Sequence, residues 1–322
     1  MSEFDMNSLE LDAASVTEHL CESIRKQILI TLRHRGAVIG ISGGIDSSVV
    51  AALCARALGS GRVLGVMMPE TESSPESEGL ARELASQYGF ESIKEDISAG
   101  LAGLGCYQRR DEAIKQLFPA FNSEFRAKIT IQTSILEKEA MNFFHLHLEN
   151  DKGETFVKRM PLDVYLQIVA ASNLKQRLRM TTLYYHAEKR NWAVVGTGNK
   201  DEHEQGFFVK YGDGGADLKP IAHLFKMQVY QIAEYLRIPK SIIDRTPTTD
   251  TYSAEVTQEE FFFGLDFYKM DMLWYAMEHH ISPVKAAAVL ELTPDQVQRA
   301  YANIERKIKA TEYLRMSPLE IK

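Results

Sequence analysis

The sequence predicts an α/β fold, a doubly wound parallel sheet covered by helices on both faces. Two observations lead to this prediction. Short, continuously apolar runs alternate with helical segments in the first hundred residues, as expected for strands buried on both faces and joined by right-handed crossovers. One of these runs leads into a turn rich in glycine and serine at 42–48, and a further helix follows.

The elements follow from local patterns. Leu20, Ile24, Ile28 and Leu32 recur at helical spacing and predict an amphipathic helix over 15–35, ended by Gly36. Apolar runs predict strands, and segments with one apolar stripe predict helices. The expected strands are 37–41, 63–68, 92–97 and 192–197, and the expected helices are 49–58, 76–88 and 226–236.

Two regions depart from this alternation. Residues 101–165 contain alternating apolar and polar residues from Phe144 to Glu149, the turn 150–153, and a second run from Thr155 to Val157. This pattern predicts a β-hairpin preceded by helices, inserted into the α/β fold. Residues 255–317 predict helices alone. We therefore expect a single domain over 1–322, with an insertion at about 101–165 and a helical C-terminal region at about 255–322.

Composition narrows the class of protein. The 322 residues carry a formal net charge of −7, a poor match for nucleic-acid binding, which requires a basic face. The three cysteines, Cys21, Cys54 and Cys106, are far apart, so neither a disulfide framework nor a zinc site is expected. A reducing cytoplasm fits best. The acidic N-terminus lacks the apolar core of a signal peptide, and no apolar run is long enough to cross a membrane.

The turn at 42–48 reads Ser-Gly-Gly-Ile-Asp-Ser-Ser and lies between a strand and a helix. Free N–H groups at a helix N-terminus favour an anion, and glycines let a phosphate approach the backbone. Asp46 places a carboxylate beside this anion site, which a bridging Mg²⁺ would reconcile. The turn is neither a Walker A loop nor a GxGxxG loop. A serine-rich helix cap without a ligand is the alternative.

This segment resembles the SGGxDS loop of the N-type ATP pyrophosphatases. The resemblance implies a Rossmann-like fold of the adenine-nucleotide α-hydrolase type and cleavage of ATP between its α- and β-phosphates. Adenylylation of an acceptor oxygen releases pyrophosphate, and a nucleophile then displaces AMP. A carboxylate oxygen leaves poorly on its own, and adenylylation makes it a good leaving group.

A second stretch resembles one family within this group. Residues 196–220 read GTGNKDEHEQGFFVKYGDGGADLKP, similar to the NAD synthetase pattern GT…E…GFFTKYGDGGADL.P. The segments 173–180, 224–226 and 246–250 also resemble that family. The resemblance covers about 15–100 and 170–255 well. It implies an ammonia-dependent NAD synthetase activity that adenylylates the nicotinate carboxylate of deamido-NAD and lets ammonia displace AMP.

The resemblance also implies residue roles. Asp46 and Glu202 would hold Mg²⁺, and Lys226 and Lys210 would join them as catalytic residues. Arg177, Lys210 and Asp217 would bind deamido-NAD. Asp213 lies with Asp217 in a second glycine-rich turn, at 212–217, and is left unassigned. ATP would contact Gly40, Ile41, Ser42, Gly43, Gly44, Ile45, Asp46, Ser47, Thr197, Lys226 and Thr248.

The sequence departs from the family pattern at the C-terminus and in the insertion. The family's His-Lys pair is replaced by Tyr313-Leu314, so that contact is not carried over. Arg109, Arg110, Lys158 and Arg159 of the insertion are candidates to compensate, with the insertion serving as a lid or as part of a dimer interface. His145 and His147 share one face of the expected strand and could suggest a metal site. Because no third ligand is evident, an ordinary hairpin is expected there.

Competing interpretations remain. An amide ligase for another carboxylate is the first alternative, and a catalytically inactive nucleotide sensor is the second. The acidic balance disfavours transfer RNA thiolation. About 40 residues precede the loop, which leaves no room for a glutaminase, so free ammonia or a separate glutaminase subunit is the expected nitrogen source. The family resemblance also implies a homodimer, and no nucleic-acid or membrane partner is expected.

Overall fold

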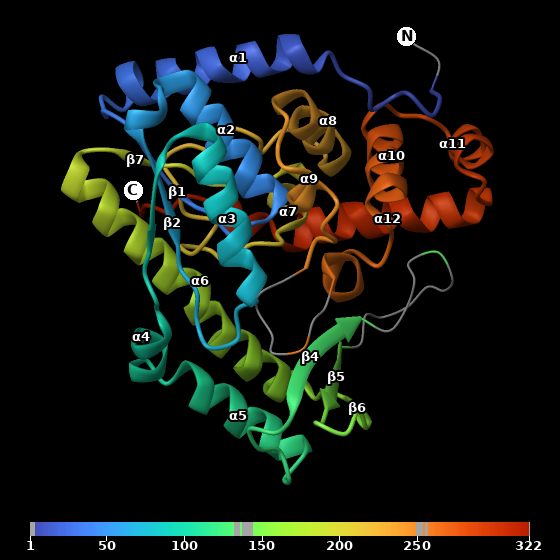
Figure 1. Cartoon of the computed structure of the whole chain (residues 1–322). Helices are drawn as coiled ribbons and strands as arrows, with labels where there is room; N and C mark the ends of the chain where they lie inside the picture. The colour runs from blue at the N-terminus through green and yellow to red at the C-terminus, as the bar shows by residue number, and fades with distance from the viewer. Residues whose placement is uncertain (1–3, 132–135, 137–143, 249–253, 255–256, 322) are drawn as a thin grey trace.

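The core of the molecule is a parallel four-stranded sheet, seen here in a computed structural model that describes residues 4–131, 136, 144–248, 254 and 257–321. The strands are β1 (Ala37–Gly40), β2 (Val63–Met67), β3 (Glu91–Lys94) and β7 (Ala193–Val194), in the order β3-β2-β1-β7 (Figure 1). Val38 pairs with Leu64 on one side and with Val194 on the other. Strand β1 thus lies inside the sheet, between β2 and β7, as its continuously apolar sequence predicts.

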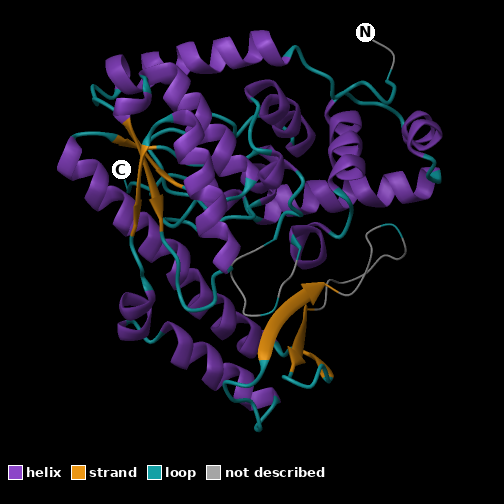
Figure 2. Ribbon diagram, in the orientation of Figure 1, coloured by secondary structure: helices purple, strands orange, loops and turns teal. Residues whose placement is uncertain are grey.

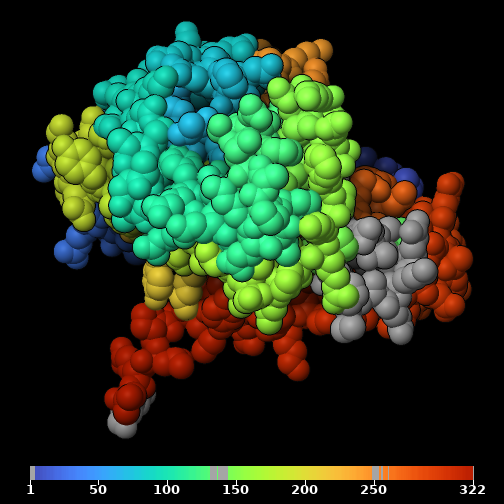
Figure 3. Space-filling view, turned by 90° about the horizontal axis from the view of Figure 1, so that it is seen from below, coloured from blue at the N-terminus to red at the C-terminus, as the bar shows by residue number. Residues whose placement is uncertain are grey.

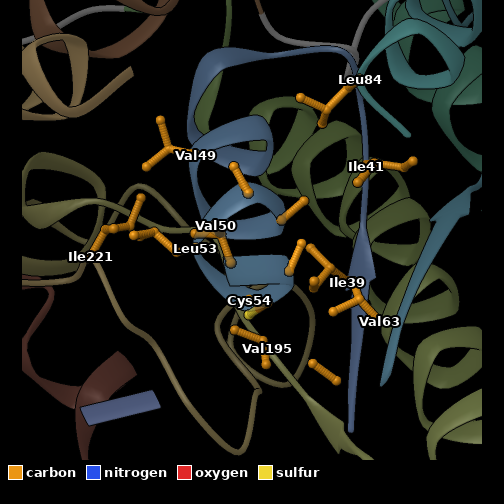
Figure 4. Close-up of a cluster of buried hydrophobic side chains, with 14 of the residues drawn as sticks. Ile39, Ile41, Val49, Val50, Leu53, Cys54, Val63, Leu84, Val195 and Ile221 are labelled. Carbon is orange, nitrogen blue, oxygen red and sulfur yellow. The ribbon is translucent and has the colours of Figure 1, made fainter. Parts of the chain in front are cut away.

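Helices cover both faces of this sheet. Ile39 and Ile41 point into a core formed with α2 (Ile45–Leu58) and α3 (Pro75–Tyr88), as Figure 4 shows. The same core includes α1 (Ala13–Lys26) and α8 (Lys226–Leu236). Val38 points to the opposite face, where it packs with residues of the long helix α6 (Leu162–Arg190). Residues that alternate along one strand thus enter two separate cores, as a doubly wound sheet requires.

The insertion forms a small layer of its own. After α4 (Ser98–Gly103) and α5 (Cys106–Leu117), the strands β4 (Arg126–Ile131), β5 (Phe144–Glu149) and β6 (Thr155–Arg159) form an antiparallel sheet (Figure 2). The predicted helices and hairpin are confirmed, and β4 is an additional strand. Part of the insertion, at 132–135 and 137–143, lies outside the described residues.

The C-terminal region is helical in its described part, as predicted. It contains the π-helical turn η3 (Glu259–Phe263), α10 (Phe267–Glu278), α11 (Pro283–Leu290), α12 (Pro294–Ala310) and α13 (Glu312–Arg315). Their core surrounds Trp274 and also takes in Phe4 and Leu9 from the start of the chain. Among the helices of the described residues, none is both long and apolar enough to cross a membrane.

Several boundaries differ from the predicted ones. The first helix ends at Lys26 and continues as a π-helical turn, η1 (Gln27–Thr31). The strand expected over 192–197 is two residues long: the Val195 N–H still donates to the Val38 carbonyl at 2.9 Å, but the bridge partner of Val195 is Leu218. Short elements complete the chain at η2 (Ser60–Arg62), α7 (Lys200–Gln205) and α9 (Lys240–Ile243).

A buried ion cluster joins the insertion to the sheet. The Lys175 ammonium of α6 lies 3.0 Å from Glu70 and 2.6 Å from Glu72, in the segment that follows β2. Arg110 of α5 also pairs with Glu72, and the Tyr107 hydroxyl donates to Glu70 at 2.8 Å. Burial acts to raise the pKa of Glu72, but Lys175 and Arg110 outweigh it and hold that pKa below its ordinary value. The cluster therefore ties α5, α6 and the post-β2 segment together.

Lys175→Met should lower the free energy of unfolding by about 3–5 kcal/mol, because it leaves buried carboxylates without the ammonium that they share. The side chains of Lys175 and Glu70 are 1% and 0% exposed, so water cannot replace the lost charge. Urea unfolding measures the effect. Lys189→Met, at an exposed position of the same helix, should change stability by less than about 0.5 kcal/mol. Equal small losses in both variants would contradict a stabilising cluster.

Candidate functional site

The glycine-rich turn lies where β1 gives way to α2, at the carboxyl edge of the sheet. Gly44 is the N-cap of α2, and the hydroxyls of Ser47 and Ser48 donate to its carbonyl at 3.0 Å and 2.8 Å. Gly43 has φ +72°, and a Cβ there would lie 2.8 Å from the Ser77 carbonyl oxygen. Only glycine fits this position without strain. The turn thus lies at the N-terminus of a 14-residue helix, and such a position favours an anion.

A cavity of about 770 Å³ opens in front of this turn. Its volume lies in the range of small-molecule and cofactor sites. Its walls come from the turn, the post-β2 segment, α6, residues 195–219, α8 and residues 313–314. The structure brings most of the predicted ATP and metal residues to these walls, namely Gly40, Ile41, Ser42, Gly44, Ile45, Asp46, Ser47, Thr197, Glu202, Lys226 and Thr248. Thr249 and Asp250, from the same predicted motif as Thr248, lie outside the described residues.

A buried ion pair links the two helices at the base of the cavity. The Lys226 ammonium, from the first residue of α8, pairs with the Asp46 carboxylate of α2. The Asn199 side-chain amide donates to the other Asp46 oxygen at 3.0 Å. Burial acts to lower the pKa of Lys226, but Asp46 and Glu202 outweigh it and raise that pKa. Lys226 therefore stays charged although its side chain is 1% exposed.

Glu202 is held by the start of α7. Its backbone N–H donates to the Asn199 side chain at 3.0 Å, and the Asn199 N–H donates to the Glu202 carboxylate at 3.3 Å, which forms a capping box. Gln258 donates to the second Glu202 oxygen at 3.3 Å. Withdrawal from water, followed by repulsion from Asp46, raises the pKa of Glu202 to about 8. A cation bound beside these two carboxyl groups would favour the ionised form of Glu202.

The donor types at this position fit the predicted Mg²⁺, which prefers oxygen ligands. Among the described residues there is no cluster of three or more His, Cys, Asp or Glu side chains that could hold a metal ion. Mg²⁺ does not need such a cage, since it commonly binds one or two carboxylates together with substrate phosphates and water. Asp46 and Glu202, on the walls of one cavity, are a donor set of that kind. The metal remains a prediction from these residues.

Two acidic residues that were not among the predicted site residues hold the N-terminus of α8. The backbone N–H groups of Lys226 and Met227 donate to Asp201 at 2.9 Å and to Asp271 at 2.8 Å. Burial raises the pKa of Asp201 to about 6, and burial together with Asp201 raises the pKa of Asp271 well above its ordinary value. Asp201 was visible beside Glu202, whereas Asp271 lies inside a helix with no local signal. Both fix the helix end that carries Lys226.

The predicted deamido-NAD residues lie outside the described walls of this cavity. Arg177 donates to the Lys210 carbonyl at 3.3 Å. The Lys210 ammonium donates to the carbonyls of Tyr313 and Met316 at 2.9 Å and 3.1 Å. Asp217 accepts the Val194 N–H at 2.8 Å and the Tyr184 hydroxyl at 3.0 Å. In this structure Asp217 therefore holds β7 against α6, and the substrate roles of all three remain predictions.

The insertion cations predicted to compensate for Tyr313-Leu314 are also away from the described walls. Arg110 belongs to the Glu72 ion cluster, and Lys158 donates to the Leu117 carbonyl at 2.7 Å. The lid role of the insertion stays a prediction. Cavity residues that the sequence analysis did not select include Arg179, Phe208, Asp213 and Lys219, as well as Tyr313 and Leu314 themselves.

A parallel sheet with a helix N-terminus, a buried lysine and two carboxylates at its carboxyl edge is typical of α/β proteins that bind phosphorylated ligands there. Comparison with known proteins narrows this class. The family model described as NAD synthase matches residues 16–141 and 142–318. The chain therefore belongs to the NAD synthase family, and the family predicted from the sequence is confirmed.

Individual relatives also carry the name of this family. The chain is 47% identical to the NH(3)-dependent NAD(+) synthetase of Rhizobium rhizogenes, over 99% of this chain and 96% of that protein. It is 46% identical to the protein of the same name from Rhizobium meliloti, over 98% and 94%. The solved NH3-dependent NAD synthetase from Campylobacter jejuni superposes with a TM-score of 0.62 at 22% identity, over 97% of this chain and 100% of that one. The predicted α/β fold of the adenine-nucleotide α-hydrolase type is confirmed.

Glu202→Gln should stabilise the metal-free protein at alkaline pH. A carboxyl group whose pKa is raised on folding stabilises least when it is ionised, so wild-type stability should fall as pH rises from about 4.3 through the folded pKa of about 8. The glutamine removes this loss. We expect a gain of at least about 1.4 kcal/mol at pH 8.5, the equivalent of one pKa unit, and a smaller gain at pH 5.5. Thermal unfolding in EDTA measures it.

Glu204→Gln is the matched control, since Glu204 lies two residues further along α7 and its side chain does not line the cavity. That variant should follow the wild-type stability at both pH values. A Glu202→Gln protein that is no more stable than wild type at pH 8.5 would show that the carboxylate is not strained in the absence of metal.

Proposed function

We propose that the chain is an ATP-dependent amide ligase that converts deamido-NAD to NAD. The nicotinate carboxylate attacks the α-phosphorus of ATP, pyrophosphate leaves, and ammonia then displaces AMP from the acyl adenylate. Family membership supports this, as do relatives named NH(3)-dependent NAD(+) synthetase that align over nearly the whole chain. The observation that carries the proposal is that most of the ATP and metal positions implied by the family line one cavity.

The site residues have separate roles in this reaction. The N–H groups at the start of α2 and the Lys226 ammonium bind ATP phosphates, and Thr197 and Thr248 contribute from two further walls. Asp46 and Glu202 would hold Mg²⁺, which supplies positive charge as negative charge moves onto pyrophosphate. Arg177, Lys210 and Asp217 are proposed to bind deamido-NAD. Ammonia comes free or from a separate glutaminase, and a cytoplasmic location fits both.

We also propose a homodimer with α6 in its interface. Leu162 and Leu166, which lie one turn apart on this helix, are 71% and 54% exposed. Such apolar exposure along one helix is typical of an interaction surface, and a two-fold dimer is the commonest oligomer. An interface there would place Arg177, from the same helix, next to the partner subunit.

Replacing Leu162 and Leu166 together by glutamate should convert the dimer to monomers, because it buries charge in an apolar interface. Sedimentation equilibrium measures the change in mass. Ile30→Glu is the control, since Ile30 is 70% exposed at η1 on a different part of the molecule. A wild-type monomer at micromolar concentration, or a double variant that stays dimeric, would refute this interface.

Asp46→Asn should lower pyrophosphate release with ATP, Mg²⁺, ammonia and deamido-NAD by at least about 100-fold, because one electrostatic group aimed at developing charge contributes about 10²–10³ to the rate. The release of pyrophosphate and the formation of NAD are measured together. Asp244→Asn makes the same substitution at an exposed position and should leave the release of pyrophosphate and the formation of NAD unchanged.

The wild-type protein decides between the candidate functions. Pyrophosphate release with deamido-NAD supports the proposal. Release with a different carboxylate alone would establish the alternative amide ligase, and ATP binding without release for any carboxylate would establish a nucleotide sensor. Normal turnover in Asp46→Asn would remove the metal role from Asp46.

A further inference from the structure

Asn199 is hydrogen-bonded to both carboxyl groups that are proposed to hold Mg²⁺. Its side-chain amide donates to one oxygen of Asp46 at 3.0 Å. Its side-chain oxygen accepts the backbone N–H of Glu202 at 3.0 Å, and its own backbone N–H donates to the Glu202 carboxyl group at 3.3 Å. Asn199 is 0% exposed. One buried residue thus links α2, which carries Asp46, to α7, which carries Glu202.

The other partners of these two carboxyl groups do not link them in this way. Lys226 pairs with the second oxygen of Asp46, and Gln258 donates to the second oxygen of Glu202 at 3.3 Å. Among the hydrogen bonds of the described residues, each of these two partners reaches one carboxyl group, whereas Asn199 reaches both. Asn199 does not itself line the described walls of the cavity, so it acts on the two carboxyl groups from behind.

Capping of α7 does not by itself explain an asparagine at this position. Asn, Asp and Ser are about equally favourable N-caps, because each has a side-chain oxygen that accepts a backbone N–H. Asparagine also carries an amide N–H₂ group, whereas an ionised Asp has no donor and the Ser hydroxyl lies on a shorter side chain. Position 199 needs an acceptor toward α7 and a donor toward Asp46. The amide of asparagine supplies both from one planar group.

The far end of α7 is fixed independently of Asn199. Arg315, in the C-terminal segment 311–316, donates to the carbonyls of His203 at 3.1 Å and Glu204 at 2.7 Å. Carbonyls at a helix C-terminus lack partners within the helix, so this guanidinium caps α7. Beyond the segment the chain extends from the body in red in Figure 3. With its last turn held in this way, α7 should stay folded when Asn199 is replaced.

We propose that Asn199 is a positioning residue that holds the Asp46 and Glu202 carboxyl groups in the mutual orientation that a divalent cation requires. The inference rests on the proposed function, because it takes the metal roles of both carboxyl groups from there. Asp46 lies 153 residues from Asn199 in the sequence, so the chain itself does not hold the two segments together. Replacing a residue that hydrogen-bonds a metal-binding group typically costs about 10- to 100-fold in metal affinity or activity.

Isothermal titration of the full chain with ATP, in EDTA and at a series of Mg²⁺ concentrations, tests the proposal. Asn199→Ser keeps a good helix cap and loses the amide donor to Asp46. The Mg²⁺ concentration that gives half of the maximal tightening of ATP binding should therefore rise about tenfold. The Kd for ATP in EDTA should stay within about twofold of wild type, because the phosphate-binding groups are unchanged.

Asn199→Ala separates the two roles of the side chain, since alanine lacks both the cap acceptor and the amide donor. It should raise the Mg²⁺ requirement as much as Asn199→Ser does, and it should lower the Tm further because the cap is lost. A serine variant with the wild-type Mg²⁺ requirement, beside an impaired alanine variant, would show that Asn199 is a helix cap alone and would overturn the proposal.

Thr293→Ala is the matched control, because Thr293 forms the capping box of α12 and does not line the cavity. This variant should lower the Tm and leave the Mg²⁺ requirement unchanged. An equal rise in the Mg²⁺ requirement of Thr293→Ala would assign the effect to general loss of stability and would contradict the proposal.

A crystal structure of the wild-type protein with ATP and Mg²⁺ decides the question even where the Asn199 variants do not fold. The Asn199 amide should remain within hydrogen-bond distance of the Asp46 carboxylate in that complex. A carboxylate that has turned away from Asn199 would refute the positioning role.

Failure of this proposal is distinguishable from failure of the proposed function. The titrations do not involve deamido-NAD, so a different acceptor would leave their outcome unchanged. ATP binding that does not depend on Mg²⁺ in the wild-type protein would refute the metal roles of Asp46 and Glu202, and this inference with them. Mg²⁺-dependent binding that is the same in wild type and Asn199→Ser would refute the positioning role alone.

Discussion

The ion pair between Lys226 and Asp46 is the interaction on which the rest of the site depends. It joins the first turns of α2 and α8. A buried lysine destabilises the fold unless it is paired, and Lys226 is paired. The N-terminus of α8 is also held by Asp201 and Asp271, which accept its first two N–H groups. Glu202 adds a further carboxyl group beside this pair, and burial together with repulsion from Asp46 raises its pKa to about 8. A divalent cation that arrives with a phosphorylated substrate would favour the ionised form of that carboxyl group.

The sheet determines where this chemistry can occur. Parallel strands direct all their carboxyl ends to one edge, so the turn after β1, the segment after β2 and residues 195–219 after β7 meet there although they are far apart in sequence. Gly43 permits the turn to pack directly against the Ser77 backbone at the start of α3. The ion cluster of Lys175, Glu70 and Glu72 fixes the post-β2 segment to α6. The cavity walls are thus anchored by contacts that are themselves buried in the fold.

Much of this arrangement could be predicted from the sequence, because it depends on local signals. The run Ala37–Ile41 and the glycine-rich turn after it have strong periodicity and unusual composition, and they predicted a strand, a turn and a phosphate site. Strand β4 lacked such a signal, since its partner β5 begins 13 residues after its own last residue, Ile131, and Arg126 and Lys128 break its apolar character. Asp271 and Arg315 were missed for another reason. Their partners, Met227 and His203, lie 44 and 112 residues away, and no pattern in one sequence reports such contacts.

Helix α7 explains why the site and the C-terminal segment belong together. It has six residues, too few to be stable by itself, because helix nucleation is costly and is repaid only over longer lengths. Its first turn is held by the Asn199 capping box, and Asn199 also contacts Asp46. Its last turn ends at Gly206 against Thr311, and its final carbonyls are capped by Arg315. Since Glu202 lies between these two anchors, its position depends on the glycine-rich turn at one end and on the C-terminal segment at the other. The glycine-rich turn and the C-terminal segment are therefore joined through a single short helix.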